Sequence, residues 1–306
     1  MRKEYPHFKG MMPILPTLID ENGDPDLESQ KKTVDYLLAS GAVAIGHMGG
    51  ASEYFKVSND DRELLVRSLI EHVNKKVPVF IGTADTSLKE AVKHSQNAHR
   101  WGADLLMVSS PIAGVVRKPD LLYYYKEIGK ATPLPIIIQD TGASSSHYSA
   151  EFIEEIYNCV ETAGYAKAEG SGGLPKMVKL MQMFGDKMQV IGGSAGFNML
   201  FMLRHGITAY MTGTECTDVH NDVVQAYFAG DDAKADYLYH TTVLSYLQFF
   251  STANRFFLRY MLHRRGLVPG VHCIFPDESG KPDAVIIDEL DKTLEAINRI
   301  RGKNVL

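Results

Sequence analysis

The fold is organised around a short apolar strand that carries a lysine, Gly164-Tyr165-Ala166-Lys167-Ala168-Glu169-Gly170. Side chains alternate between the two faces of a strand, so Tyr165, Lys167 and Glu169 share one face. A buried ammonium is costly unless it is paired or loses its proton. A lysine driven towards its neutral form is the nucleophile that amine catalysis on a carbonyl requires. The same residues also fit a plain ion pair between Lys167 and Glu169, and the stretch alone leaves both interpretations open.

Strand and helix patterns alternate along the chain on both sides of this stretch. Eight strands are predicted: 11–19, 42–46, 77–82, 104–109, 135–139, the lysine strand, 188–191 and 207–212. Three of the intervening helix patterns end at a glycine, namely Gly41, Gly102 or Gly206. Regular alternation implies a parallel sheet, and eight units within about 215 residues fit a closed (β/α)8 barrel. The competing doubly wound open sheet usually has a glycine-rich turn after its first strand, where this chain has Asp20-Glu21-Asn22-Gly23.

After Thr212 the alternation gives way to helices. An aromatic-rich helical pattern covers about 219–265, and a last helix is expected over 283–301. These segments exceed what an eighth barrel helix needs. The sequence therefore predicts a (β/α)8 TIM barrel over residues 1–218 and a C-terminal helical region over 219–306 packed on it. We expect the aromatic residues to be core packing rather than a subunit contact.

Composition excludes several classes of function. The 306-residue chain has a net charge of −5 and no strong basic run, so neither nucleic acid nor an anionic membrane is an expected partner. No apolar run approaches the roughly 20 residues of a membrane helix, and the N-terminus lacks a signal-peptide core. Three widely spaced cysteines without a CxxC pair indicate a reducing compartment. A cytoplasmic protein is therefore expected.

The active site of such a barrel lies at the C-terminal ends of its strands. The residues expected there are small and polar and contain no HxxxH, HExxH, CxxC or close carboxylate–histidine cluster, so no metal and no cofactor is predicted. Gly49-Gly50-Ala51-Ser52 can offer successive backbone N–H groups to a substrate carboxylate, although an ordinary tight turn fits equally well. A second glycine-rich loop, 192–196, precedes a helix whose N-terminus attracts anions.

The order of these motifs resembles the dihydrodipicolinate synthase / N-acetylneuraminate lyase family of Schiff-base (β/α)8 enzymes, from Gly10 to about Pro276. The stretch 165–169 resembles the family's lysine strand, and Gly49-Gly50-Ala51-Ser52-Glu53 stands where its carboxylate loop Gly-Thr-Thr-Gly-Glu usually lies. Asn59-Asp60-Asp61-Arg62 resembles the segment that follows that loop. The resemblance implies that Lys167 forms the Schiff base and that the protein is a homotetramer built from dimers.

Departures from the family pattern narrow the prediction. The usual Tyr-Asn pair ending strand five is Gln139-Asp140, the Thr-Thr pair is Gly50-Ala51, and Pro-Tyr-Tyr after strand four is Pro111-Ile112-Ala113. The arginine that often follows strand five is absent from 143–147. Because the proton-relaying hydroxyls are gone, a dihydrodipicolinate synthase is not expected, and a plain retro-aldolase loses its usual base.

One branch of the family shares these departures. The 2-keto-3-deoxy-L-arabonate dehydratases resemble this chain in a Gln-Asp pair ending strand five and in the Ser52-Glu53 pair. We therefore predict a dehydratase whose small-molecule substrate is a 2-keto-3-deoxy sugar acid. Lys167 would attack the ketone, the iminium would acidify carbon 3, and the carbon-4 hydroxyl would leave as water.

The predicted site residues follow from the strand ends and the resemblance. The catalytic set is Lys167, Gln139 and Glu169, with Gln139 orienting a hydroxyl or a water. Glu169 either transfers protons or only neutralises the lysine, and three further acid–base candidates are Glu53, Asp140 and His147. The predicted substrate-binding residues are Gly50, Ala51, Ser52, Glu53, Asp140, His147, Gly193 and Ser194.

Two other functions stay open at this point. A pyruvate-dependent aldolase or lyase could use a relocated base such as Tyr54 or Tyr210, and it would yield pyruvate. A non-catalytic paralogue could keep the pocket only to bind a keto acid. The retained Lys167 argues against the second alternative, because a pure binder needs no amine inside a barrel.

Overall fold

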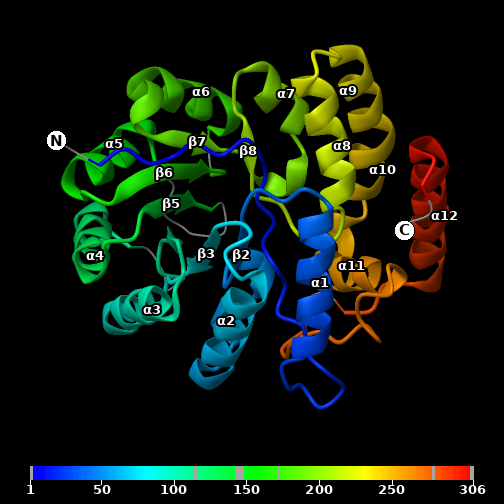
Figure 1. Cartoon of the computed structure of the whole chain (residues 1–306), viewed down its shortest axis with the longest axis horizontal. Coiled ribbons are helices and arrows are strands. Elements are labelled where there is room, and N and C mark those ends of the chain that lie inside the picture. The colour runs from blue at the N-terminus through cyan, green and yellow to red at the C-terminus, as the bar shows by residue number, and fades with distance from the viewer. Residues whose placement is uncertain (1–2, 113–115, 142–147, 171, 278–279, 304–306) are drawn as a thin grey trace.

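A computed structural model describes residues 3–112, 116–141, 148–170, 172–277 and 280–303 (Figure 1). Short parallel strands alternate with helices along this part of the chain. The strands are β1 (Gly10–Met11), β2 (Ile45–His47), β3 (Val79–Gly82), β4 (Leu105–Ser109), β5 (Ile136–Asp140), β6 (Ala163–Ala168), β7 (Gln189–Ile191) and β8 (Ala209–Tyr210). The first seven helices are α1 (Leu27–Ala39), α2 (Asn59–Val73), α3 (Leu88–Trp101), α4 (Lys118–Ala131), α5 (Ala150–Cys159), α6 (Gly173–Phe184) and α7 (Met199–Arg204).

The strands close into a barrel. Strands β2 to β7 pair in sequence order, all parallel, and β1 pairs in parallel with β8. Parallel bridges join these two groups: Ile14 reaches both Gly46 and Gly213, and Gly192 reaches Tyr210. The predicted (β/α)8 fold is confirmed. The first strand, predicted over 11–19, is only Gly10–Met11, and the other strand boundaries differ from the predicted ones by a few residues.

Local sequence signals explain where the helices begin and end. The side chains of Asp26, Ser58, Ser87 and Ser149 each accept a hydrogen bond from the backbone N–H three residues later, at the starts of α1, α2, α3 and α5. Such caps satisfy donors that the first helical turn leaves without a partner. Gly102 ends α3 with a φ of 97°, a left-handed conformation that glycine adopts without steric cost.

Alternation along the strands separates two apolar cores. One fills the barrel interior and includes Phe80, Ile137, Tyr165 and Met211. The other lies between the strands and the surrounding helices and includes Ala166 and Ala168. Tyr165 therefore points into the barrel and its neighbour Ala166 points out, which puts Lys167 on the inward face as predicted.

Helices beyond β8 cover one side of the barrel and complete the fold. They are α8 (Thr217–Phe228), α9 (Asp232–Leu238), the π-helical segment Tyr239–Val243, α10 (Leu244–Leu247), α11 (Phe250–Arg264) and α12 (Ala284–Arg301). Figure 1 shows α12 outermost, beyond α10. The division of the chain after residue 218 remains a prediction, and α8 spans that position. Among the described helices, none is both long and apolar enough to span a membrane.

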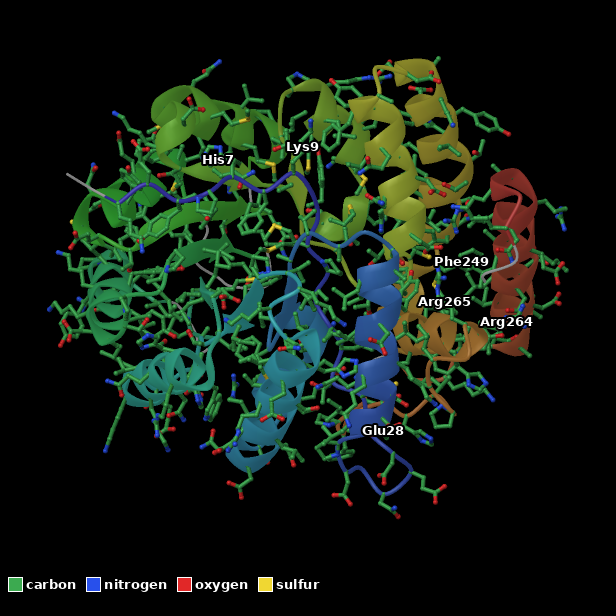
Figure 2. All side chains as sticks on the ribbon, viewed as in Figure 1. His7, Lys9, Glu28, Phe249, Arg264 and Arg265 are labelled. Atoms are coloured by element: carbon green, nitrogen blue, oxygen red, sulfur yellow. The ribbon has the colours of Figure 1, made fainter. Side chains whose placement is uncertain are left out.

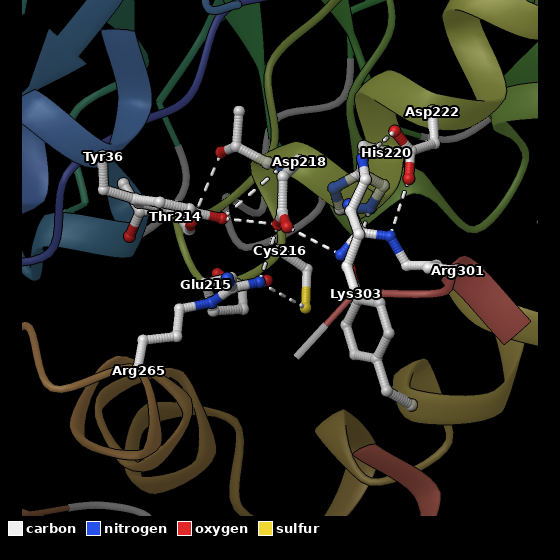
Figure 3. Close-up of polar contacts among 12 residues, drawn as sticks. Tyr36, Thr214, Glu215, Cys216, Asp218, His220, Asp222, Arg265, Arg301 and Lys303 are labelled. Carbon is white, nitrogen blue, oxygen red and sulfur yellow. Dashed lines mark hydrogen bonds and ion pairs between the residues drawn. The ribbon is translucent and has the colours of Figure 1, made fainter. Parts of the chain in front are cut away.

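A buried ionic network ties these C-terminal helices to the barrel. Figure 3 shows Asp218 between Arg265, Arg301 and Tyr36. Its carboxylate oxygens lie 2.7 Å from Arg265 Nη2 and 2.7 Å from Arg301 Nη1, and the Tyr36 hydroxyl donates to it over 2.7 Å. Figure 2 shows Arg264 and its neighbour Arg265 at the end of α11, where Arg264 Nε lies 3.3 Å from Asp291 of α12. One carboxylate thus joins α1, α8, α11 and α12.

Candidate active site

A cavity of about 660 Å³ opens at the C-terminal ends of the strands, and we call it the strand-end cavity. Side chains and backbone from most of the strand–helix loops reach it, as expected for this fold. Its lining residues are Ile14, Gly50, Ala51, Tyr54, Phe55, Ser109, Ser110, Ile112, Gln139, Thr141, Lys167, Glu169, Ser194, Ala195, Met211, Thr212, Gly213, Glu215, Phe250, Arg255 and Leu258.

The three predicted catalytic residues all line this cavity. Lys167 is only 5% exposed, and its Nζ lies 2.9 Å from Glu169 Oε2. Gln139 is the register partner of Lys167 on the neighbouring strand β5, so the two side chains enter the barrel mouth side by side. The buried lysine therefore has one carboxylate partner and one amide neighbour.

Gly193 and Ser194 fix the position of Glu169. The Ser194 backbone N–H donates to Glu169 Oε1, and a Cβ placed on Gly193 would lie 2.2 Å from that same oxygen. Contacts below 3.0 Å are essentially never found for a Cβ, so a side chain at position 193 would force the Glu169 carboxylate to move. Gly193 therefore sets the geometry of the Lys167–Glu169 pair, while Ser194 also lines the cavity.

The loop after β2 presents only part of the predicted carboxylate cradle. Gly50 and Ala51 line the cavity, and among the described residues no acceptor is recorded for their amides. Ser52 turns away: its amide donates to Gly49 O over 3.0 Å in a 3₁₀ turn, and its hydroxyl donates to Leu15 O. Ser52 shapes the loop, which leaves the amides of Gly50 and Ala51 as the loop's candidate donors to a substrate carboxylate.

Glu53 is a structural ion-pair partner that lies outside the cavity lining. It is 1% exposed, with Oε2 at 2.6 Å from Arg259 Nη2 and Oε1 at 2.9 Å from Lys56 Nζ. Burial acts to raise the pKa of Glu53, but Arg259 and Lys56 outweigh it and hold the pKa below its usual value. An ionised, doubly paired carboxylate is poorly suited to proton transfer.

Asp140 points to the opposite side of β5 from Gln139. Its Oδ2 pairs with Lys176 Nζ of α6 in the layer between strands and helices, and the residue is 1% exposed. The predicted roles for Asp140 in substrate binding and proton transfer are therefore not supported by its position. Alternation along β5 already required this, because adjacent residues of a strand face opposite ways. His147 lies outside the described residues.

Helix α11 contributes residues to the cavity that the sequence patterns did not indicate. Phe250, Arg255 and Leu258 from this helix line the cavity, so Arg255 adds a positive charge to that of Lys167. Arg255 and Arg259 are four residues apart on α11 and share a face. That spacing of two arginines was the available signal, whereas the aromatic residues of the segment were expected only in the core.

Glu215 and the tyrosines complete the site. Glu215 is fully buried, and no hydrogen-bond partner is recorded for either carboxyl oxygen within the described structure. Burial raises the pKa of Glu215 to about 7, against the opposing effects of its own backbone N–H and of Arg265. Tyr54 lines the cavity with its hydroxyl 3.5 Å from Ser109 Oγ, whereas the Tyr210 hydroxyl donates to Ile207 O between the strands and helices.

Comparison with known proteins identifies the family. The model of the dihydrodipicolinate synthetase family matches residues 7–296. The chain belongs to that family. It is 31% identical to L-2-keto-3-deoxyarabonate dehydratase from Azospirillum brasilense over 76% of this chain and 77% of that protein. It is 28% identical to 4-hydroxy-tetrahydrodipicolinate synthase from Geobacter metallireducens over 77% of this chain and 81% of that one.

A solved member of the dihydrodipicolinate synthetase family has the same fold. YagE, a prophage protein of Escherichia coli K12 solved in complex with pyruvate, superposes with a TM-score of 0.87. The match covers 95% of this chain and 99% of YagE at 21% identity. Family membership makes the protein a lyase. Its relatives are named for different reactions, so the reaction of this protein has to be inferred from the residues of its site.

Proposed function

We propose that the protein is a Schiff-base-forming dehydratase of a 2-keto-3-deoxy sugar acid. The observation that carries the proposal is Lys167, a nearly buried amine inside the strand-end cavity with Glu169 at 2.9 Å as its acceptor. The amide of Gln139 supports it, since it can orient a hydroxyl but cannot exchange protons. The similarity to a 2-keto-3-deoxyarabonate dehydratase agrees with this chemistry.

The substrate carboxylate binds at the loop after β2. Backbone N–H groups of Gly50 and Ala51 hold it, and the Arg255 guanidinium on α11 contributes positive charge to the same cavity. This anchors the keto carbon at Lys167 and directs the hydroxylated tail of the substrate towards Gln139. Fixing both ends of a small acid in one orientation is itself a large part of catalysis.

The reaction proceeds through covalent intermediates on Lys167. Its neutral amine attacks carbon 2, water leaves, and the resulting iminium acidifies carbon 3. Loss of a carbon-3 proton gives an enamine that expels the carbon-4 hydroxyl as water. For a five-carbon acid, a proton then shifts from carbon 5 to carbon 3, the enol becomes an aldehyde, and hydrolysis releases a keto-acid semialdehyde.

Product analysis tests this proposal. The wild-type protein is incubated with 2-keto-3-deoxy acids of five and six carbons, and the products are separated by liquid chromatography and mass spectrometry. We expect a product that has lost one water from the substrate and no release of pyruvate. Pyruvate appearing together with an aldehyde would show carbon–carbon cleavage and would overturn the dehydratase proposal.

A pyruvate-releasing aldolase is the second candidate, and Tyr54 is the observation that favours it. Its phenol lies in the cavity, so it could accept the carbon-4 hydroxyl proton in place of the tyrosine replaced by Gln139. Burial raises the pKa of Tyr54, however, which makes the phenol a poorer route to an ionised base at neutral pH. Tyr54→Phe distinguishes the two reactions, since it should abolish an aldolase and leave the dehydratase active.

Assembly as a homotetramer, a dimer of dimers, remains part of the proposal. It is implied by the family resemblance, and sedimentation velocity of the purified chain tests it directly. A monomer at micromolar concentration would contradict it.

A further inference from the structure

The proposed mechanism needs a residue that removes the carbon-3 proton and protonates the leaving hydroxyl. Glu169 is already occupied, because one of its oxygens contacts Lys167 Nζ and the other accepts the Ser194 N–H. Glu53 lies outside the cavity lining and forms ion pairs with the side chains of Arg259 and Lys56. Asp140 pairs with Lys176 in the layer between the strands and the helices. None of these three carboxylates stands ready to exchange a proton with a substrate.

Glu215 differs from them in both position and partners. It lines the strand-end cavity, it is fully buried, and in the described part of the chain neither of its carboxyl oxygens has a recorded hydrogen-bond partner. A buried polar group without a partner costs stability, so it persists where function requires it. We expect a substrate group in the cavity to form the hydrogen bonds that the Glu215 carboxyl lacks.

Gly213 explains how this carboxyl reaches the barrel mouth. Met211 packs in the barrel interior, and position 213 faces the same way by alternation. A Cβ placed on Gly213 would lie 2.2 Å from Glu215 Oε2. The carboxyl therefore occupies the inward space that a side chain at position 213 would otherwise fill.

The main chain at Glu215 is held in place from α11. Arg265 Nε donates to the Glu215 carbonyl oxygen over 2.7 Å, and Arg265 is itself fixed by Asp218 (Figure 3). The anchor holds the backbone, and within the described structure no other residue is recorded as a hydrogen-bond partner of the carboxyl oxygens. Such an arrangement positions a side chain without consuming its proton-accepting atoms.

We infer that Glu215 is the group that takes the carbon-3 proton and delivers it to the departing carbon-4 hydroxyl. This inference rests on the proposed function, because it needs the iminium formed at Lys167. Glu215 lines the cavity, and no other described residue is hydrogen-bonded to its carboxyl oxygens, so it is assigned the role that Glu169, held in its ion pair, does not fill.

The proton and electrons balance with this single group. The Glu215 carboxylate removes a proton from carbon 3, the C–H pair forms the C2=C3 bond, and the C=N pair returns to nitrogen. The neutral carboxyl then gives the same proton to the carbon-4 hydroxyl. The nitrogen pair re-forms C=N, the C2=C3 pair shifts to C3=C4, and the C4–O pair leaves with water. Glu215 ends as the carboxylate, and no oxidant or reductant is needed.

The electrostatic surroundings of Glu215 support both halves of this cycle. Its pKa of about 7 lets the group act as base and as acid near neutral pH. The charged or titratable groups that interact with it are Arg265 just after α11, Cys216 just before α8 and Tyr246 of α10. Lys167, Glu169 and Arg255 line the same cavity.

Proton exchange at carbon 3 tests the inference separately from Schiff-base formation. Wild type and the Glu215→Gln variant are incubated with pyruvate in deuterium oxide, and deuterium entering the methyl group is followed by nuclear magnetic resonance. Parallel samples are reduced with borohydride, and the adduct is weighed by intact-mass spectrometry. We expect Glu215→Gln to exchange at least about 10²-fold more slowly while its adduct yield stays within about threefold of wild type.

Two further variants distinguish proton transfer by Glu215 from a general disturbance of the structure around it. Thr214→Val changes a buried neighbour that does not line the cavity, and it should exchange at the wild-type rate. Glu215→Asp keeps a carboxyl and should exchange faster than Glu215→Gln. The assignment would be overturned if Glu215→Gln exchanged at the wild-type rate, or if Thr214→Val slowed exchange as much as Glu215→Gln does. Failure of the wild type to form any adduct would overturn the proposed function as well.

Discussion

Replacing Gly193 by alanine should disable the Lys167–Glu169 pair without touching either residue. The new Cβ would lie 2.2 Å from Glu169 Oε1, whereas real Cβ contacts are essentially never closer than 3.0 Å. The carboxylate must therefore retreat by about 0.8 Å or more from an ion pair whose N–O distance is now 2.9 Å. A misplacement of about 1 Å costs on the order of 10²-fold in rate, which is about 2.7 kcal/mol of transition-state stabilisation.

The assay is the initial rate of adduct formation between pyruvate and the protein, measured by borohydride quench and intact mass. We expect Gly193→Ala to slow this rate by about 10²-fold in the wild-type background. In a Glu169→Ala background the alanine at 193 has no carboxylate to displace, so the second change should add less than about twofold. Equal losses in both backgrounds would refute the reasoning, because the damage would then come from the loop itself.

Three further predictions concern buried ionisable groups away from the lysine. Lys176→Met leaves Asp140 buried and unpaired and should lower the free energy of unfolding in urea by about 3–5 kcal/mol, whereas adding Asp140→Leu should restore most of it. Arg301→Met should lower the free energy of unfolding by roughly 2–3 kcal/mol and speed amide exchange in α12. This loss is smaller than that of Lys176→Met because Arg265 still pairs with Asp218. Glu215 has a folded pKa of about 7 against an ordinary 4.5, so between those pH values the folded state binds more protons than the unfolded state. Stability should therefore fall by about 3 kcal/mol as pH rises from 4.5 to 7, and Glu215→Gln should lack this fall in urea titrations. The first prediction would be contradicted if Lys176→Met were as stable as wild type. The second would be contradicted if amide exchange in α12 were unchanged in Arg301→Met, and the third if Glu215→Gln kept the wild-type dependence of stability on pH.

Periodicity along the chain was sufficient to predict the barrel and the inward direction of Lys167. Both depend on local patterns: alternation within a strand, and helices that begin at a capping side chain or end at a glycine. The same alternation places Gln139 inward and Asp140 outward, and applying it strictly would have removed Asp140 from the predicted site. That error came from carrying a residue pair over from a motif without asking which way each side chain points.

Other features of the site depend on tertiary contacts that no local pattern contains. Glu215 faces the cavity because Gly213 has no side chain and because Arg265, fifty positions later in the sequence, holds its main chain. Arg255 reaches the cavity only because α11 packs across the barrel mouth. Ser52 was predicted to bind substrate, yet its donors are used within the loop and by Leu15. These partners lie far apart in the sequence, so local patterns could not predict them.

The most direct test of the central claim is to locate the covalent adduct. Wild-type protein is treated with pyruvate and borohydride, digested, and mapped by tandem mass spectrometry, with Lys167→Ala treated in parallel. We predict that the reduced adduct lies on Lys167 alone and that Lys167→Ala gives none under conditions in which it remains folded. An adduct on another lysine, such as the buried Lys176, or no adduct on the wild type, would contradict the assignment of Lys167 as the Schiff-base residue.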